Sequence, residues 1–299
     1  MAEIHEELVN RLSAAVDKMP AFPKSVQRVL ELTREDDYPL QELVSVIESD
    51  PVMTVKLLRI LNSAYYNFPK KITSVNESVS YLGMNTIKNM ALSFAAMQVL
   101  PQQNAAGFDA QRFLLHSLIT ASVARSLCLH YCHDQTNPGD CYIVGLLHDF
   151  GKVVLAQFLA PEFKQALECS LNQAITLHEA EQQVIGLDHS EIGWMLMTKW
   201  RFPEQLTETV RRHHGDISAD DTMLSCLFMA DEISKLLAME EGGSLKQKQL
   251  PSSLAEYFGG QLLDVIASLK DISKLESEAH VLAQAGGYNI KYGLWGLSG

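Results

Sequence analysis

Apolar residues recur at helical spacing along most of the chain, and this pattern limits the possible folds more than any other feature. Leu40, Val44 and Ile47 share one helical face. After a Ser-Asp-Pro break, the next helix has a broad apolar face that consists of Val52, Val55, Leu58, Ile60 and Leu61. No convincing run of alternating apolar and polar residues indicates a strand. The sequence therefore predicts an all-α fold.

Local signals predict where some of these helices begin and end. Asp50 suits an N-cap, because Pro51 follows it at the first helical position. Ser74 with Glu77 three residues later fits a capping box, and Gly83 fits a C-terminal stop.

Two polar stretches divide the chain into three parts. Residues 101–111 and the sequence EEGGSLKQKQLPSS at 240–253 are typical of loops. They separate an N-terminal helical lobe (1–100) from a second helical lobe (101–240) and a C-terminal extension (241–299). In the extension we expect one or two helices and an irregular tail.

Composition narrows the possible partners and the compartment. Hydrophobic residues make up 47% of the 299 residues, which allows a sizeable core. The net charge of −12 opposes broad electrostatic binding, so we expect no nucleic acid and no membrane as partners. We see no apolar run as long as a membrane-spanning helix. Five cysteines without a paired spacing and an acidic N-terminus argue against secretion, and we expect a cytoplasmic protein.

The sequence GLLHDFGK, residues 145–152, places an imidazole and a carboxylate at the end of an apolar helix. His148 and Asp149 follow five residues that are apolar or Gly, and we expect the chain to break at Gly151. Burying both polar groups without partners would cost several kcal/mol. A metal ion, a bound phosphate or partners elsewhere in the chain must therefore satisfy them.

Further histidines and one aspartate lie in comparable helical settings: His116, His189, His213, His214 and Asp231. Imidazole and carboxylate are usual ligands of Zn, Fe and Mn, and a bridging carboxylate suits a two-metal site. Each residue also has an ordinary explanation. A lone histidine in an apolar helix is usually a hydrogen-bonded core residue, paired histidines can be cations at a helix C-terminus, and Asp231 can be an internal cap.

Two other segments have residue patterns that could indicate a functional site. CLHYCHD, residues 128–134, looks metal-binding, but Cys128 and Cys132 lie one turn apart at the end of an apolar helix, and we interpret them as two buried thiols. The loop NSAYYNFPKKITS, residues 62–74, joins aromatic residues to two lysines. For this loop we favour packing between the lobes over partner docking. The sequence contains no glycine-rich phosphate loop and no nucleophile elbow.

The order His, His-Asp and then a distant Asp on helices resembles the HD superfamily, which is named for its metal ligands. GLLHDFGK and the Ala-Asp pair at 230–231 match its motifs, and DHSEIG and HHG resemble the additional histidines that hold a second metal in HD-GYP phosphodiesterases. The N-terminal half, from MPAFPKSVQRVLEL to the NSAYY…KITS…ES…YLG run, is similar to the HDOD domain, an HD-related output domain of bacterial signalling proteins. The resemblance covers roughly residues 18 to 235.

This resemblance implies an HDOD lobe packed on an HD-type helical lobe, with one or two divalent ions of Fe, Mn or Zn. The implied metal ligands are His116, His148, Asp149, His189, His213, His214 and Asp231. Two features depart from HD-GYP enzymes. Arg112 stands one turn before His116, where some of those enzymes carry a Glu ligand, and a guanidinium favours phosphate or carboxylate over metal. The sequence GDISADD stands in place of the GYP loop.

HDOD proteins are generally regarded as regulatory modules. We therefore expect a bacterial signalling module that acts through a signalling protein partner or a small phosphorylated ligand and retains an HD-type metal site. The alternative is a metal-dependent phosphohydrolase for a nucleotide or cyclic dinucleotide. In that case Asp149 and Lys152 would be catalytic, a metal-activated water would attack, and Lys152 or Arg112 would hold the phosphate. A third interpretation is a hydrogen-bonded structural relic.

Overall fold

The computed structural model describes residues 2–32, 40–101, 103–132, 136–239, 249–269 and 271–288, with side chains from residue 9 onward and none at 238–239. Residues 289–299 of the predicted irregular tail (286–299) and most of the predicted break at 240–253 lie outside the described residues, and Gly286 is the last residue of the helix before that tail. Every regular element in the described ranges is a helix, which confirms the predicted all-α class.

The helices follow one another through short turns and loops. In chain order they are α1 (Ala2–Lys18), α2 (Lys24–Leu32), α3 (Leu40–Glu48), α4 (Pro51–Leu61), α5 (Val75–Leu82), α6 (Met84–Gln98), α7 (Ala110–Tyr131), α8 (Pro138–Leu147), α9 (Gly151–Phe158), α10 (Ala160–Gln173), α11 (Leu177–Val184), α12 (His189–Lys199), α13 (Glu204–Arg211), α14 (Thr222–Met239), α15 (Ser252–Tyr257), α16 (Leu262–Ser268) and α17 (Ile272–Gly286).

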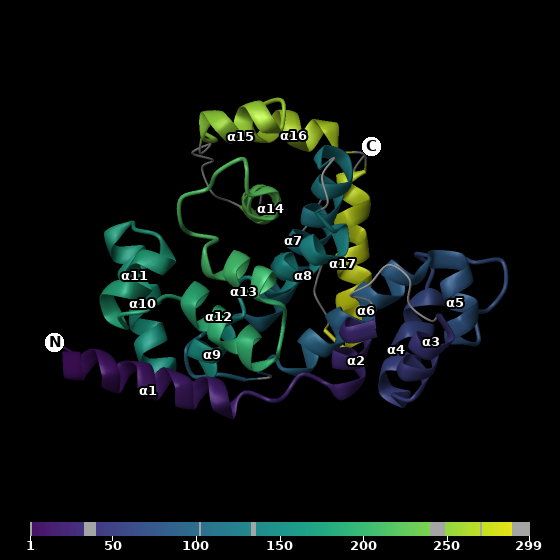
Figure 1. Ribbon diagram of the computed structural model, residues 1–299, viewed down its shortest axis with the longest axis horizontal. Coiled ribbons are helices and arrows are strands. Elements are labelled where there is room, and N and C mark those ends of the chain that lie inside the picture. Colours follow the sequence, from purple (N-terminus) through teal and green to yellow (C-terminus); the bar gives the residue numbers. More distant parts are fainter. Residues whose placement is uncertain are drawn as a thin grey trace.

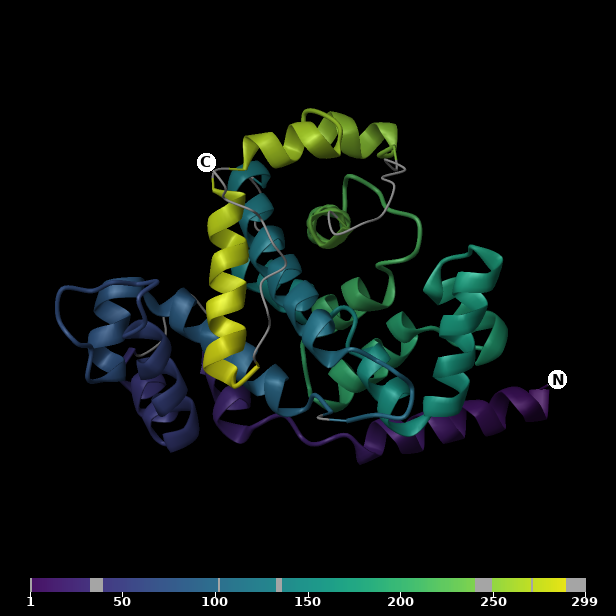
Figure 2. The same cartoon turned by 180° about the vertical axis from the view of Figure 1, so that it is seen from behind.

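The long helix α7 is the centre of the packing. It contacts α8, α14 and α17, and α17 also contacts α4 and α6 (Figure 1). The C-terminal helix thereby joins the first hundred residues to the region that carries the histidines, and its Ala279, Leu282 and Ala283 are buried. Helix α1 lies at the edge of the molecule, where it packs beside α9 and α12. The view from behind shows the same arrangement (Figure 2).

Two of the predicted helix boundaries rest on the expected caps. Asp50 accepts a hydrogen bond from the Met53 amide ahead of Pro51, and Ser74 accepts one from the Glu77 amide. The Glu77 carboxylate accepts from the amide of Thr73 rather than from that of Ser74, so the capping box closes one residue early. The predicted stop at Gly83 is confirmed, with φ of 75°.

The apolar face of α4 agrees with the sequence-based expectation only in its second half, where Ile60 and Leu61 are buried. Val52 and Val55 are 57% and 65% exposed, whereas Met53, Leu57 and Ile60 are at most 1% exposed. Apolar residues surround most of this short helix, so its own periodicity does not fix which side is buried. The contacts of α4 with α6 and α17 make that choice.

The C-terminal extension contains three helices among the described residues rather than the expected one or two. Gly259, with φ of 72°, ends the first, and Asp271, with φ of 64°, precedes the last. A positive φ interrupts a right-handed helix. The apolar pattern of residues 254–284 is continuous enough to hide these breaks.

Two segments are long and apolar enough to cross a membrane by length and composition, in contrast to the expectation that none would be. They are Ala110–Tyr131 and Pro138–Phe158, with mean hydropathies of 1.3 and 1.2. Of their most apolar windows, 67% and 83% is buried inside the structure. Such burial is typical of core helices, which can be as long and as apolar as membrane-spanning helices.

The aromatic loop at residues 62–74 packs against α17. Tyr65 donates to the carbonyl of Lys274, and the ring of Tyr66 stacks with Phe68 at 5.9 Å while its hydroxyl interacts with Glu278. We expect Tyr66→Ala to lower the free energy of unfolding by roughly 2–4 kcal/mol, less than for a fully buried ring. Tyr66→Phe keeps the ring and should lose only about 1 kcal/mol. Urea denaturation of both variants tests this, and equal losses would contradict packing as the main cause.

Candidate metal centre

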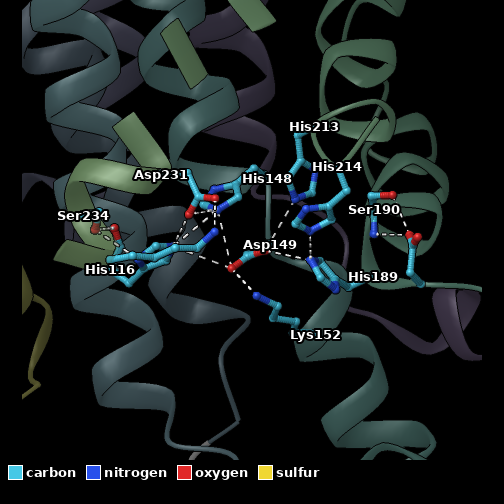
Figure 3. Close-up of polar contacts among 12 residues, drawn as sticks. His116, His148, Asp149, Lys152, His189, Ser190, His213, His214, Asp231 and Ser234 are labelled. Atoms are coloured by element: carbon cyan, nitrogen blue, oxygen red, sulfur yellow. Dashed lines mark hydrogen bonds and ion pairs between the residues drawn. The ribbon is translucent and has the colours of Figure 1, made fainter. Parts of the chain in front are cut away.

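Five parts of the chain bring the predicted ligands to one place (Figure 3). His116 comes from α7, His189 from the first position of α12 and Asp231 from α14; His148 and Asp149 lie in the turn before α9, and His213 and His214 in the turn after α13. The structure therefore brings together all seven residues, although they span 115 positions of the sequence.

One group of side chains surrounds His116 and His148. Their Nε2 atoms lie 3.4 Å apart, and Asp231 Oδ1 lies 3.3 Å from that of His116 and 3.7 Å from that of His148. Asp149 Oδ2 lies 3.7 Å and 3.5 Å from the same two nitrogens. Two imidazoles and two carboxylates thus face a common point.

A second group lies on the other side of Asp149. Its Oδ1 is 3.1 Å from His189 Nε2 and 3.7 Å from His213 Nε2. His214 Nε2 lies 2.8 Å from His189 Nε2, and one ligand atom from each of these four residues lies within 4.8 Å of the others. Because each oxygen of Asp149 faces a different group, this carboxylate has the position of a bridging ligand in a two-metal site.

Hydrogen bonds at the Nδ1 atoms of two histidines fix the direction in which the lone pairs on their Nε2 atoms point. The Nδ1 atoms of His148 and His213 donate to the carbonyls of Gly145 and Val210, at 2.9 Å and 2.6 Å. In a neutral ring this bond leaves the lone pair on Nε2, toward the centre. Metal-binding histidines are held in the same way in proteins.

The centre contains acceptors without donors. His213 Nε2 and Asp231 Oδ1 are buried and accept no hydrogen bond from the described residues. The lone pair of His213 Nε2 faces Asp149 Oδ1 at 3.7 Å, and two such acceptors repel each other unless a proton or a cation lies between them. Buried polar groups are rarely left unpaired. The donor set of nitrogens and carboxylate oxygens therefore fits a divalent transition metal.

Three of the side chains, Asp149, Asp231 and His213, have the protonation states that suit a metal. Burial opposes the negative charges of Asp149 and Asp231, but nearby histidine and lysine side chains outweigh it and hold the pKa of each carboxyl well below its usual range. Burial lowers the pKa of His213 to about 4. Charged carboxylates and neutral imidazoles are the forms that bind metal ions.

Two glycines permit the approach of the helices that carry these ligands. A Cβ at Gly145 would lie 2.7 Å from Ala121 Cα, and one at Gly151 would lie 1.9 Å from the carbonyl oxygen of His189. The expectation of a break at Gly151 is wrong, because the break is the turn at residues 148–150 and Gly151 begins α9. This glycine serves close packing of α9 on α12 rather than helix termination.

Two lysines neutralise the carboxylates. Lys152 donates to Asp149 Oδ2 at 2.5 Å, and Lys235, one turn after Asp231, donates to Asp231 Oδ2. The sequence analysis included Lys152 but missed Lys235, although its spacing of four from Asp231 is that of a helical ion pair. Arg112 is exposed, and the structure shows no ion pair between its guanidinium and the described residues of the centre.

Glu181 is a buried residue that the sequence analysis missed. Its Oε2 accepts from His189 Nδ1 at 2.5 Å and from the His189 amide at 2.8 Å. Burial alone would lower the pKa of His189, but the Glu181 carboxylate raises it to about 9. Glu181 therefore fixes the orientation of this ring, and a metal ion at His189 Nε2 would have to displace the second proton of the ring.

We expect Glu181→Gln to weaken metal binding by about 10–100-fold, the usual effect of removing such a partner of a metal-binding histidine. Isothermal titration of metal-stripped protein would measure it. Glu191→Gln is the matched control, since Glu191 lies on the same helix as His189 but pairs with Arg211 at the surface. An unchanged affinity in Glu181→Gln would show that His189 is not a ligand.

The sequence was compared with models of known protein families. Residues 19–215 match the HDOD domain, which is about two thirds of the chain. The chain belongs to the HDOD domain family. The family assignment agrees with the resemblance seen in the sequence, and the matched range includes helices α2 to α6, which precede the histidines.

Several solved structures share this fold at low identity. An HDOD domain protein from Geobacter sulfurreducens superposes with a TM-score of 0.76 at 22% identity, covering 94% of this chain and 99% of that one. A protein from Marinobacter aquaeolei VT8, provisionally named a signal transduction protein, gives 0.74 at 22% identity over 95% and 66%. A Shewanella amazonensis SB2B protein, provisionally named a phosphohydrolase, gives 0.64 at 21% identity over 93% and 97%.

Among curated proteins, an uncharacterised protein of Treponema pallidum is 24% identical over 255 residues, 84% of this chain and 48% of that protein. The HDOD chain thus spans about half the length of this relative.

Proposed function

We propose that this HDOD protein is a bacterial signalling module that acts by binding a protein partner or a small phosphorylated ligand and holds a divalent transition metal at its histidine and aspartate centre. The observation that carries the proposal is the set of imidazoles whose Nδ1 atoms are engaged outward while their Nε2 atoms face Asp149. The signalling role is supported by the family and by the name given to the Marinobacter protein of the same fold.

One or two ions of Fe, Mn or Zn would be held by the two groups that share Asp149. His116, His148 and Asp231 belong to the first, and His189, His213 and His214 to the second. A bound ion would supply Lewis acidity and a positive charge for an anionic ligand. The protein itself contributes the orientation of the rings, through Glu181 and the backbone carbonyls, and exclusion of water by the buried helices around them.

A metal-dependent phosphohydrolase is the second candidate, because no predicted HD ligand is missing from the centre. Two features weigh against hydrolysis. Lys152, the candidate phosphate contact, is already bound to Asp149. The loop after His214 carries Asp216 and Asp220, both exposed, and Asp221, which pairs with Arg212. Carboxylates near a phosphate repel it by roughly 1 kcal/mol each at 4 Å in water.

We expect metal-loaded protein to hydrolyse cyclic dinucleotides slowly or not at all. Steady-state turnover with Mn or Fe, beside an Asp149→Ala control, distinguishes the two candidates. A rate well below about 1 per second supports the signalling module. Metal-dependent turnover at or above that rate, abolished in Asp149→Ala, would establish the phosphohydrolase instead.

A further inference from the structure

Two cysteines from distant parts of the chain have their sulfur atoms in contact. Cys132 directly follows α7 and Cys226 lies on α14, and their Sγ atoms are 3.5 Å apart although the two residues are 94 positions apart in the sequence. Both cysteines are free. A disulfide bond is about 2.05 Å long, so the two sulfurs would have to approach each other by only about 1.5 Å more.

The two sulfurs differ in their access to solvent. Cys226 is 0% exposed, whereas Cys132 is half-buried. The interpretation of Cys128 and Cys132 as two buried thiols is therefore correct for Cys128, which is 1% exposed, but only partly for Cys132. An accessible cysteine beside a second one is the usual arrangement of redox-sensing pairs, in which an oxidant reaches the first sulfur and the second resolves the product.

We propose that Cys132 and Cys226 are a redox-sensitive modification site, at which hydrogen peroxide converts the two thiols into a reversible disulfide. Disulfides that form in proteins of a reducing compartment are usually transient and redox-sensing. This proposal does not depend on the proposed function of the histidine and aspartate centre, because neither cysteine belongs to the ligand groups around Asp149.

The reaction has two steps, and Cys132 reacts first. Its thiolate attacks one oxygen of the peroxide, the O–O bond breaks, and the hydroxide that leaves takes up the proton lost by the thiol, which gives a sulfenic acid and water. The sulfur of Cys226 then attacks that of Cys132, the S–O bond breaks, and the second hydroxide leaves as water with the proton of Cys226. Two sulfurs are oxidised, and both peroxide oxygens are reduced to water.

The surroundings of the two sulfurs favour this order. The hydroxyl of Tyr257 donates to Cys132 Sγ at 3.7 Å, so a hydrogen-bond donor lies beside the sulfur that must carry negative charge for the attack. Contact with Cys132 and burial both raise the pKa of the Cys226 thiol. Cys226 therefore stays protonated, and inaccessible to peroxide, until the sulfenic acid forms next to it.

The disulfide would constrain the part of the chain that forms the histidine and aspartate centre. The closed loop, residues 132–226, contains five of the seven predicted ligands, and the other two, His116 and Asp231, lie on the two helices that the disulfide would join. These helices, α7 and α14, already pack against each other. A cross-link that closes a long loop stabilises a protein chiefly by restricting its unfolded state. The oxidised protein should therefore melt at a higher temperature than the reduced protein.

Peptide mapping of the oxidised full chain tests the proposal. The protein is reduced, freed of reductant and treated with equimolar hydrogen peroxide beside a chelator, which prevents metal-catalysed oxidation. Mass spectrometry without reduction then locates the cross-link. We expect a bond between Cys132 and Cys226, the loss of two of the five free thiols, and recovery of both after addition of dithiothreitol. The melting temperature is measured before and after oxidation.

Single variants test the role of each cysteine. In Cys226→Ala the sulfenic acid at Cys132 has no partner, and dimedone, which reacts with sulfenic acids, should label it. In Cys132→Ser the thiol of Cys226 should stay reduced, because it is buried. The matched control is Cys169→Ser, which removes a half-buried cysteine on α10 and should form the disulfide as the wild type does. Circular dichroism checks the fold of each variant, and the wild-type mapping decides the proposal even if a variant does not fold.

Two results would overturn the proposal. One is retention of all five thiols in folded, peroxide-treated protein, and the other is a cross-link between different cysteines, such as Cys128 and Cys141. An unchanged melting temperature in protein with the mapped Cys132–Cys226 bond would instead refute the stabilising effect of the disulfide on the centre.

Discussion

Gly151→Ala should destabilise the protein more than any other small substitution in the centre. The added Cβ would lie 1.9 Å from the carbonyl oxygen of His189 and 2.9 Å from the amide nitrogen of Gly193. Both are backbone atoms of α12, so the helix itself must move. Overpacking of a core usually costs 1–3 kcal/mol, and we expect about 3 kcal/mol or more here. Because α12 carries His189, metal affinity should fall as well.

Urea denaturation of metal-stripped protein measures the change in the free energy of unfolding without any contribution from metal binding. Gly139→Ala is a suitable control, since its Cβ would first meet the side-chain oxygen of Asn137, at 3.0 Å, rather than backbone. We expect the control to lose less than about 1 kcal/mol, because alanine is the better helix former. A Gly151→Ala protein as stable as the wild type would mean that α9 and α12 do not pack as described.

Asp149→Ala should remove more metal affinity than any other single change in the centre. Asp149 lies within 3.7 Å of His116, His148, His189 and His213, and it is the residue shared by both groups of ligands. Loss of a direct ligand should exceed the 10–100-fold effect of losing an outer partner. If the site holds two ions, the stoichiometry should also fall.

Inductively coupled plasma mass spectrometry after dialysis against Mn or Fe measures the metal content of the Asp149→Ala protein. The matched control is Asp220→Ala, which removes an exposed carboxylate from the loop after His214. Its metal content should equal that of the wild type. Full metal content in Asp149→Ala would assign the ions to a place other than this centre.

The sequence predicts the ligands better than it predicts their surroundings. His148-Asp149 at the end of an apolar run is unusual enough to indicate a site, and the order of the other ligands supplies the rest. Glu181, eight residues before His189 on a different helix, gives no local signal, because its burial depends on how α11 meets α12. Cys226 likewise looks like an isolated core residue, although α14 brings its sulfur within 3.5 Å of that of the half-buried Cys132.

The fold shows the same division between local and tertiary causes. The caps at Asp50 and Ser74 depend on a few neighbouring residues, and they are found nearly as predicted. The buried face of α4 and the breaks near Gly259 and Asp271 depend on contacts with other helices or on backbone conformation that apolar spacing does not encode. The limits of the two lobes stay predictions.

The central claim is that the histidine and aspartate centre holds a transition metal. The most direct measurement is the melting temperature and metal content of the metal-stripped protein, before and after reconstitution with Mn, Fe or Zn. We predict one or two ions per chain and a rise in melting temperature, because a ligand that binds only the folded state stabilises it by about 2.7 kcal/mol at one hundred times its Kd. Protein that stays empty after reconstitution, with an unchanged melting temperature, would contradict the claim.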